Sequence, residues 1–244
     1  MHQFYCPNAD LSAEQTLIDD KNELHHLRNV LRLKKNAEIT LFDGKGKEAK
    51  GILLSVTAQK ATIKIQSVRQ LERKKPLILL ACALPKKSKF EMIIEKATEL
   101  GVDEIIPLKT DRTEIKISDE RQIKKQLRYQ AIAINASKQS KRTIIPIIHP
   151  ITDFSTALGD LTKNTITIIP SLTGNTKNIF SIFEKIKSPK AISFLIGPEG
   201  DFTPEEYAQA QDQGCIPVTL GKTILKVETA AICTLSCANL FFHT

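Results

Sequence analysis

The stretch that most constrains the fold lies near the carboxyl terminus, where the apolar run 191–196 ends in Gly-Pro-Glu-Gly. A continuous apolar run of this length is typical of a strand buried on both faces of a parallel sheet. A helix start follows, with Thr203 as N-cap, Pro204 at the first helical position and Glu206 three residues after the cap. The loop is therefore predicted between a strand's carboxyl end and a helix, where open α/β sheets place their ligands. An ordinary strand-to-helix turn explains Gly-Pro-Glu-Gly alone equally well.

Strands and helices alternate from Leu77 onward, which indicates an α/β domain with a parallel sheet. The patterns predict strands at 77–84, 103–108, 143–148, 165–169, 191–196 and 216–220, and helices at 89–100, 119–139, 151–158, 178–186, 203–213 and 228–242. In the helix predicted for 119–139, an apolar stripe is expected to face the core: Ile123, Leu127, Ala131 and Ile134.

Residues 1–72 have a different, β-rich pattern. They predict strands at 37–42, 47–56 and 61–68, with a turn at 43–46. Before them, a short helix at 22–33 is expected to present His25, Arg28 and Arg32 on its polar side. A small barrel with a basic rim suits contact with an RNA backbone. The charged segment 71–76 ends in proline and is a plausible linker.

The net charge of +8 is unevenly distributed. Residues 1–75 and 76–150 each carry 14 Lys and Arg against 9 Asp and Glu, whereas residues 151–244 carry 7 against 9. The basic excess therefore lies away from the predicted ligand loops, as expected if one part binds a polyanion while another part performs the chemistry. Because solvated basic faces are common, the charge alone favours nucleic acid only modestly.

The cysteines and the apolar runs indicate the cellular environment in which the chain is expected. Its five cysteines are scattered in apolar surroundings without a Cys-x-x-Cys pair, so we expect reduced thiols and no metal site. No apolar run approaches 18 residues, and the amino terminus has no signal-peptide pattern. We therefore expect a soluble, cytoplasmic protein without a membrane partner.

Two nucleotide-binding motifs are excluded. Gly221-Lys222-Thr223 lacks the earlier glycine of a phosphate-binding P-loop, since position 216 is isoleucine, and no Gly-x-Gly-x-x-Gly fingerprint follows a strand. What remains is two glycine-bearing loops after strands, Gly-Pro-Glu-Gly and the segment 220–229. Such loops could enclose a flat apolar ring, such as adenine, through backbone groups.

The run IGPEGDFTPEE, followed by LGKTILKVETA, resembles the bacterial small-subunit ribosomal RNA uridine-N3 methyltransferases, the RsmE family of the SPOUT class. HHLRNVLRLKKNAEITLFDGKGKE resembles the amino-terminal RNA-binding segment of that family, and EKATELGVDEIIPLKTDRTE and ASKQSKRTIIPII resemble its stretches before the Gly-Pro-Glu-Gly loop. Each fragment alone is weak, but together and in order they cover most of the chain.

The resemblance implies a PUA-like β-barrel at 1–72 and a SPOUT α/β methyltransferase domain at 73–244, whose parallel sheet is tied in a trefoil knot. It also implies S-adenosylmethionine as cofactor, 16S ribosomal RNA or the small ribosomal subunit as substrate, and a homodimer. The cofactor residues carried over are Pro170, Leu195, Ile196, Gly197, Gly200, Leu220, Gly221, Ile224 and Leu225, with Ser171 as a further pocket residue. The aliphatic members could equally be core residues of the knot.

The sequence departs from the family pattern in three places. Asp201 replaces the second glycine of Gly-Pro-Glu-Gly-Gly-Phe. Thr223 and Lys226 stand where the family has Arg-Ile-Leu-Arg, and Lys138 reverses the charge of a glutamate. These departures leave the cofactor assignment intact and make the substrate side less secure.

The resemblance and the chemistry suggest roles for the charged residues. Glu199 is expected to orient the cofactor or the base, with anchoring of its own loop as the alternative, while Arg142, Arg112 and Lys226 hold phosphate or the developing anion. The RNA-binding residues expected are His25, Arg28, Arg32, Arg112 and Gln139, and for Arg112 and Arg142 plain RNA contact or surface salt bridges are alternatives.

Two other functions stay open at this point. One is a SPOUT enzyme with another RNA target, such as a ribose 2′-hydroxyl. The other is a non-catalytic RNA-binding factor in ribosome assembly, which the two lost arginines favour.

Overall fold

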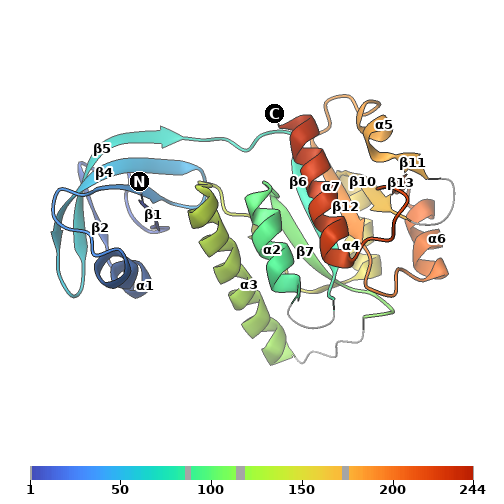
Figure 1. Ribbon diagram of the computed structural model, residues 1–244, viewed down its shortest axis with the longest axis horizontal. Coiled ribbons are helices and arrows are strands. Elements are labelled where there is room, and N and C mark those ends of the chain that lie inside the picture. The colour runs from blue at the N-terminus through green and yellow to red at the C-terminus, as the bar shows by residue number, and fades with distance from the viewer. Residues whose placement is uncertain (1, 86–88, 114–118, 172–175, 244) are drawn as a thin grey trace. The chain divides into compact units, whose positions relative to one another are not determined.

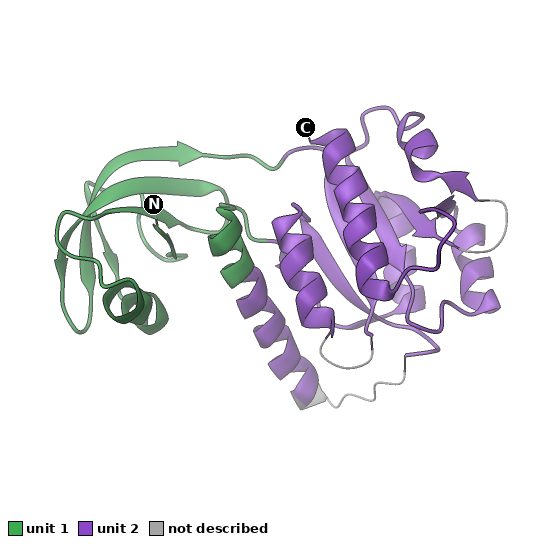
Figure 2. Cartoon of the chain, in the orientation of Figure 1, with its two compact units in different colours: residues 1–73, 134–145 green, residues 74–133, 146–244 purple. Residues whose placement is uncertain are grey.

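The computed structural model describes residues 2–85, 89–113, 119–171 and 176–243 (Figure 1). The chain divides into two compact units (Figure 2). Unit 1 comprises residues 1–73 and 134–145, and unit 2 comprises residues 74–133 and 146–244. The sequence-based division at residues 72 and 73 did not foresee that the segment 134–145 packs with the amino-terminal unit.

Unit 1 is built on a five-stranded sheet with the order β1-β3-β4-β5-β2. Its strands are β1 (His2–Tyr5), β2 (Gln15–Ile18), β3 (Glu38–Phe42), β4 (Lys47–Val56) and β5 (Ala61–Gln70). β1 runs parallel to β3, and the other neighbours are antiparallel. Side chains such as Ile39, Leu53 and Ile63 are fully buried beneath the sheet. The predicted strands β3, β4 and β5 are present, whereas β1 and β2 were not predicted because runs of four residues carry little periodic signal.

The helix predicted for residues 22–33 is shorter and less regular. α1 (Lys21–His25) starts at Asp20, whose carboxylate accepts hydrogen bonds from the backbone N–H groups of Asn22 and Glu23. It continues as one π-helical turn, η1 (His26–Val30), and ends there. Leu24 and Leu27 are buried against the sheet. This arrangement leaves the predicted RNA-binding face exposed: His25, Arg28 and Arg32.

Unit 2 is an α/β domain on a sheet with the order β11-β13-β10-β12-β6-β7-β8. Its strands are β6 (Leu77–Ala83), β7 (Glu104–Lys109), β8 (Ile147–Ile148), β9 (Thr152–Asp153), β10 (Ile166–Pro170), β11 (Lys177–Asn178), β12 (Ala191–Ile196) and β13 (Ile216–Thr219). The pairings within this sheet are parallel, including that of β9 with β7. The parallel α/β architecture predicted from the alternating pattern is therefore confirmed.

Helices cover both faces of this sheet. The helices of unit 2 are α2 (Lys89–Glu99), α4 (Phe154–Asn164), α5 (Ile179–Phe183), α6 (Pro204–Asp212) and α7 (Val227–Phe242), together with the first part of α3 (Asp119–Ser140), which continues into unit 1 from residue 134. α7 packs beside α2 and over β6 and β12, while α4 packs on β7 and β10 and beside α6 (Figure 1). The core beneath α4 is apolar and includes Leu108, Leu158 and Leu195.

Three predictions in unit 2 were wrong in detail. The strand expected at 143–148 is reduced to β8, because Pro146 has no N–H to donate to a ladder. The helix expected at 151–158 begins only at Phe154, after the short strand β9, and extends to Asn164.

The prediction of which face of α3 is buried is also wrong. Ile123 and Leu127 are 62% and 68% exposed, and the buried face is formed instead by Tyr129, Ala133 and Ala136. The ring of Tyr129 packs against Phe90 at a centroid distance of 5.1 Å. Periodicity identified the helix but not the side that is covered.

The cysteines are free thiols, as predicted, and Cys6, Cys82 and Cys215 are buried. Burial is the main cause that raises the pKa of Cys215 to about 11, so this thiol stays protonated near neutral pH. Within the described residues, no helix combines the length and the apolar character that crossing a membrane requires.

Candidate active site

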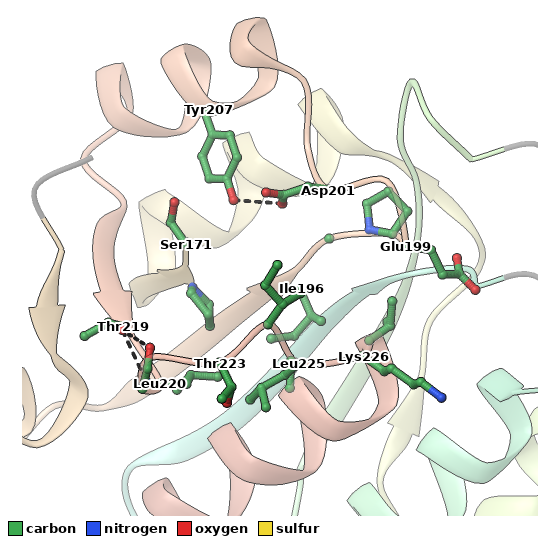
Figure 3. Close-up of a pocket in the computed structure, with 17 residues that line it drawn as sticks. Ser171, Ile196, Glu199, Asp201, Tyr207, Thr219, Leu220, Thr223, Leu225 and Lys226 are labelled. Atoms are coloured by element: carbon green, nitrogen blue, oxygen red, sulfur yellow. Dashed lines mark hydrogen bonds between the residues drawn. The ribbon is translucent and has the colours of Figure 1, made fainter. Parts of the chain in front are cut away.

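A cavity of about 270 Å³ lies in unit 2, at the carboxyl ends of β10, β12 and β13 (Figure 3). Its walls come from three loops and from the first turns of α6 and α7. They are Pro170 and Ser171, then Ile196, Gly197, Pro198, Glu199 and Asp201, then Tyr207, and finally Thr219, Leu220, Gly221, Thr223, Ile224, Leu225, Lys226, Val227 and Ala230. The cavity therefore occupies the edge of the sheet where the sequence predicted a ligand.

The loop after β13 turns sharply at Gly221. This residue has a φ of +134°, which side chains rarely adopt, although a Cβ there would meet no atom within 4 Å. The Thr219 hydroxyl accepts a hydrogen bond from the Gly221 N–H at 3.2 Å and donates one to the Gly221 carbonyl at 2.9 Å. This closed turn presents the backbone of Leu220 and Gly221 to the cavity.

The loop after β12 is closely packed around Gly197. A Cβ at that position would lie 3.2 Å from both Asp201 Oδ1 and the Phe202 ring. The Arg112 guanidinium donates hydrogen bonds to the carbonyls of Gly200 and Phe202 on the outer side of the same loop. After the loop, α6 starts with the predicted capping box between Thr203 and Glu206, so a local sequence signal fixes where the loop ends.

Asp201 connects this loop to α6. Its φ is +64°, a left-handed conformation that costs an ordinary residue roughly 1–2 kcal/mol but that Asp and Asn tolerate better than most. Its Oδ1 accepts a hydrogen bond from the Tyr207 hydroxyl at 2.8 Å (Figure 3) and another from the Phe202 N–H at 2.8 Å. The Ser171 side chain also hydrogen-bonds to Tyr207. Burial and the nearby Asp201 carboxylate raise the pKa of Tyr207, so this hydroxyl keeps its proton.

Charged side chains gather at the other end of the cavity. Glu199 and Lys226 extend to the same side in Figure 3, away from Tyr207. Nearby, the Glu228 carboxylate pairs with Lys89 at 3.4 Å. Burial first, and then the charges of Glu199 and Glu228, raise the pKa of the Cys82 thiol at the end of β6. The negative charges of Glu199 and Glu228 therefore both act on Cys82. Because its pKa is raised, this thiol keeps its proton and is not a nucleophile.

Most of the residues predicted for the cofactor line this cavity: Pro170, Ile196, Gly197, Leu220, Gly221, Ile224 and Leu225. Leu195 is fully buried in the sheet core, which was its alternative role, and Gly200 faces Arg112 instead of the cavity. Sequence reasoning missed Tyr207, although it is the only aromatic residue of the helix that follows the loop.

The remaining predicted residues are distributed over both units. Of the catalytic set, Glu199 and Lys226 line the cavity, whereas Arg142 belongs to unit 1, where its carbonyl accepts a hydrogen bond from Gln3. Arg112 lies in unit 2, beside the loop after β12. His25, Arg28, Arg32 and Gln139 belong to unit 1.

Gln139 lines a polar cavity within unit 1. This cavity has a volume of about 460 Å³, and its wall includes His26 and the buried ion pair of Glu23 with Lys138, whose closest N–O distance is 2.6 Å. No cluster of three or more His, Cys, Asp or Glu side chains among the described residues could hold a metal ion.

Comparison with known proteins places this geometry in a family. A family model described as an RNA methyltransferase domain matches residues 72–239, and one described as an RNA methyltransferase PUA domain matches residues 18–66. Ribosomal RNA small subunit methyltransferase E of Bacillus subtilis is 33% identical over 219 residues, which cover 88% of this chain and 86% of that protein.

Two solved structures agree over nearly the whole chain. The ribosomal RNA small subunit methyltransferase E of Neisseria gonorrhoeae, bound to S-adenosyl methionine, is 32% identical with a TM-score of 0.86, and the match covers 99% of this chain and 98% of that one. A methyltransferase of Legionella pneumophila in complex with the cofactor SAM is 30% identical with a TM-score of 0.86, covering 98% and 96%. By sequence, by domain content and by fold, the chain belongs to the ribosomal RNA small subunit methyltransferase E family.

Proposed function

We propose that this protein is an S-adenosylmethionine-dependent methyltransferase that modifies N3 of a uridine in the 16S RNA of the small ribosomal subunit. The observation that carries the proposal is the cavity formed by three loops at the carboxyl ends of β10, β12 and β13. Relatives named for methylation of small-subunit ribosomal RNA support the class of substrate. The choice of uridine N3 rests on the resemblance in the loop sequences.

The residues of the cavity fit the proposed cofactor. Ile196, Ile224 and Leu225 offer an apolar wall for a flat ring, and the backbone of Leu220 offers hydrogen-bonding groups at its edge. Ile224 is 81% exposed, an unusual value for isoleucine that binding of an apolar group would reduce. Ser171, Tyr207 and Asp201 supply polar groups at the other end.

When bound, the cofactor supplies an electrophilic methyl group on a sulfonium. Alignment of the uridine nitrogen with that methyl group supplies roughly 7–11 kcal/mol of the barrier, so most of the protein's task is positioning. The uridine N3 loses its proton as its new bond to carbon forms. We assign to Glu199 the orientation of the base or cofactor, and to Lys226 the stabilisation of the negative charge that develops on the ring.

The RNA is bound by basic and polar side chains of both units. His25, Arg28 and Arg32 of unit 1 are exposed and available to phosphates, and we assign Gln139, Arg142 and Arg112 to the same substrate. Because N3 lies on the Watson–Crick edge, the target base must be unpaired or turned out when it reacts. Ribosomal subunits as substrate imply action in the cytoplasm.

A homodimer and a trefoil knot complete the proposal. After Glu228, α7 has no charged residue, and its outer side carries Cys233, Cys237 and Leu240, which is 66% exposed. A helix that is apolar on its outer side favours burial against another subunit. The return of the chain from β13 to α7, across β10 and β12, is the path that a knot in this region would take.

The test is to incubate the purified protein with labelled S-adenosylmethionine and unmodified small ribosomal subunits, and then to identify the labelled nucleoside. We expect the label in N3-methyluridine. Label on a ribose would keep the enzyme class and overturn the target. Absence of cofactor binding would instead favour the non-catalytic assembly factor, for which the lost arginines are the specific observation.

A further inference from the structure

Asp201 brings a carboxylate into the cavity at a position that most side chains avoid. Its backbone is left-handed, and its Oδ1 is held by the hydroxyl of Tyr207 and the N–H of Phe202. Both of these hydrogen bonds are accepted by the same carboxylate oxygen. One oxygen is therefore held by the protein, and the residue itself lines the cavity.

The carboxylate of Asp201 determines the sign of the net charge of the cavity wall. Three of the described residues that line the cavity have ionisable side chains with a formal charge, namely Glu199, Asp201 and Lys226, and their formal charges sum to −1. Glu199 and Lys226 have opposite formal charges, are exposed, and extend to the same side of the cavity (Figure 3). Asp201 is half-buried beside Tyr207, where water screens its charge less.

We propose that the Asp201 carboxylate makes this cavity prefer the cationic cofactor S-adenosylmethionine over its product S-adenosylhomocysteine. The inference rests on the proposed function. In the transfer, the bond between uridine N3 and the methyl carbon forms, the carbon–sulfur bond breaks, the sulfur keeps the electron pair, and the N3 proton leaves to water. The bound molecule thereby loses one positive charge, so a fixed negative charge in the wall binds it more weakly after the reaction than before.

The same contacts could serve only to brace the loop, and Asp201→Asn separates the two roles. The asparagine amide oxygen can accept the hydrogen bonds from Tyr207 and Phe202, and asparagine tolerates a left-handed backbone. This variant therefore keeps the brace and removes the charge. Asp160→Asn is the matched control, because Asp160 is an exposed carboxylate on α4 outside the cavity.

The experiment measures the dissociation constants of both molecules by calorimetry for the wild type and the two variants, with thermal unfolding of the ligand-free proteins as a check on folding. For Asp201→Asn we expect S-adenosylmethionine to bind roughly five- to tenfold more weakly and S-adenosylhomocysteine to change by less than about twofold. Asp160→Asn should leave both constants unchanged.

Two results for Asp201→Asn would overturn the proposal. Equal weakening of both molecules would mean that Asp201 binds a group that they share, and unchanged affinities would leave it a brace of the loop. A wild type that binds neither molecule would instead refute the proposed function. If Asp201→Asn does not fold, Asp201→Gly tests the same ratio, because glycine adopts the left-handed backbone freely; a ratio equal to that of the wild type would then reject the inference.

Discussion

Glu199 and Lys226 are the charged residues best placed to act on the substrate, since both line the exposed end of the cavity. For Glu199→Gln we expect the methylation rate to fall by about 10²-fold, the lower end of what general acid–base groups contribute, with an unchanged affinity for S-adenosylmethionine. Single-turnover methylation and calorimetry measure the two effects separately.

The matched control is Glu205→Gln. Glu205 is an exposed carboxylate in the first turn of α6, outside this cavity, and its substitution should leave the rate unchanged. A Glu199→Gln variant that methylates at the wild-type rate would remove Glu199 from the chemistry. Loss of cofactor affinity in proportion to rate would leave it the alternative role of anchoring the loop.

Gly221 tests whether the backbone of the loop after β13 matters in itself. A Cβ there has open space, so Gly221→Ala acts only through the positive φ and should cost about 1–3 kcal/mol of unfolding free energy, together with weaker cofactor binding. Gly159→Ala also adds a methyl group to open space, but inside α4, where it should stabilise by about 0.5–1 kcal/mol. Urea unfolding of the two variants should therefore show opposite signs, and equal signs would contradict the strain argument.

At the scale of elements, the parts that could be predicted from the sequence are those with local signals. The strand β12 and the capping box of α6 are both encoded within a few residues, and both are present as predicted. The hydrogen bond between Tyr207 and Asp201 has no such local signal, because it depends on how α6 is placed relative to the loop. The buried face of α3 was predicted wrongly for a similar reason. The helical periodicity is a local signal, but the residues that pack against the helix, such as Phe90, are distant in the sequence. The elements that bound this loop were thus predictable, and contacts between elements were not.

The stability of the folded chain is expected to depend on pH through the helical segment of unit 1. Burial first, and then the positive charge of Lys138, lowers the pKa of His26 in η1 below its usual 6.5. As pH falls below 6.5, the unfolded chain gains a proton at His26 that the folded chain does not, so unfolding becomes easier. Denaturant unfolding should therefore show a stability that declines from pH 7 towards pH 5, and His26→Gln should flatten this decline.

His25→Gln is the control for this pH dependence, because His25 is the exposed neighbour in the same segment. It should retain the decline of the wild type. An equal flattening in both variants would assign the effect to charge on the helix in general and not to the burial of His26.

At the scale of the whole molecule, the cavity proposed for the cofactor is lined by residues of unit 2, whereas the predicted phosphate contacts Arg28 and Arg32 lie in unit 1. Binding of RNA and binding of cofactor should therefore be separable by substitution. The double variant Arg28→Ala/Arg32→Ala should weaken RNA binding and lower the slope of log K against log salt by about 1.4, since each phosphate contact in a single strand contributes roughly 0.7. Its dissociation constant for S-adenosylmethionine should equal that of the wild type.

Two exposed lysines of unit 2 provide the matched control for that charge change. Lys185→Ala/Lys187→Ala removes the same number of charges from residues next to α5, away from the lining of the cavity. If binding depends only on net charge, both double variants will lose affinity and salt dependence alike. If unit 1 carries the phosphate contacts, only the arginine variant will do so, and filter binding at several salt concentrations decides between them. The second result would mean that the two units have separate binding roles. The amino-terminal sheet and its helical turn would bind RNA, and the parallel sheet would bind the cofactor.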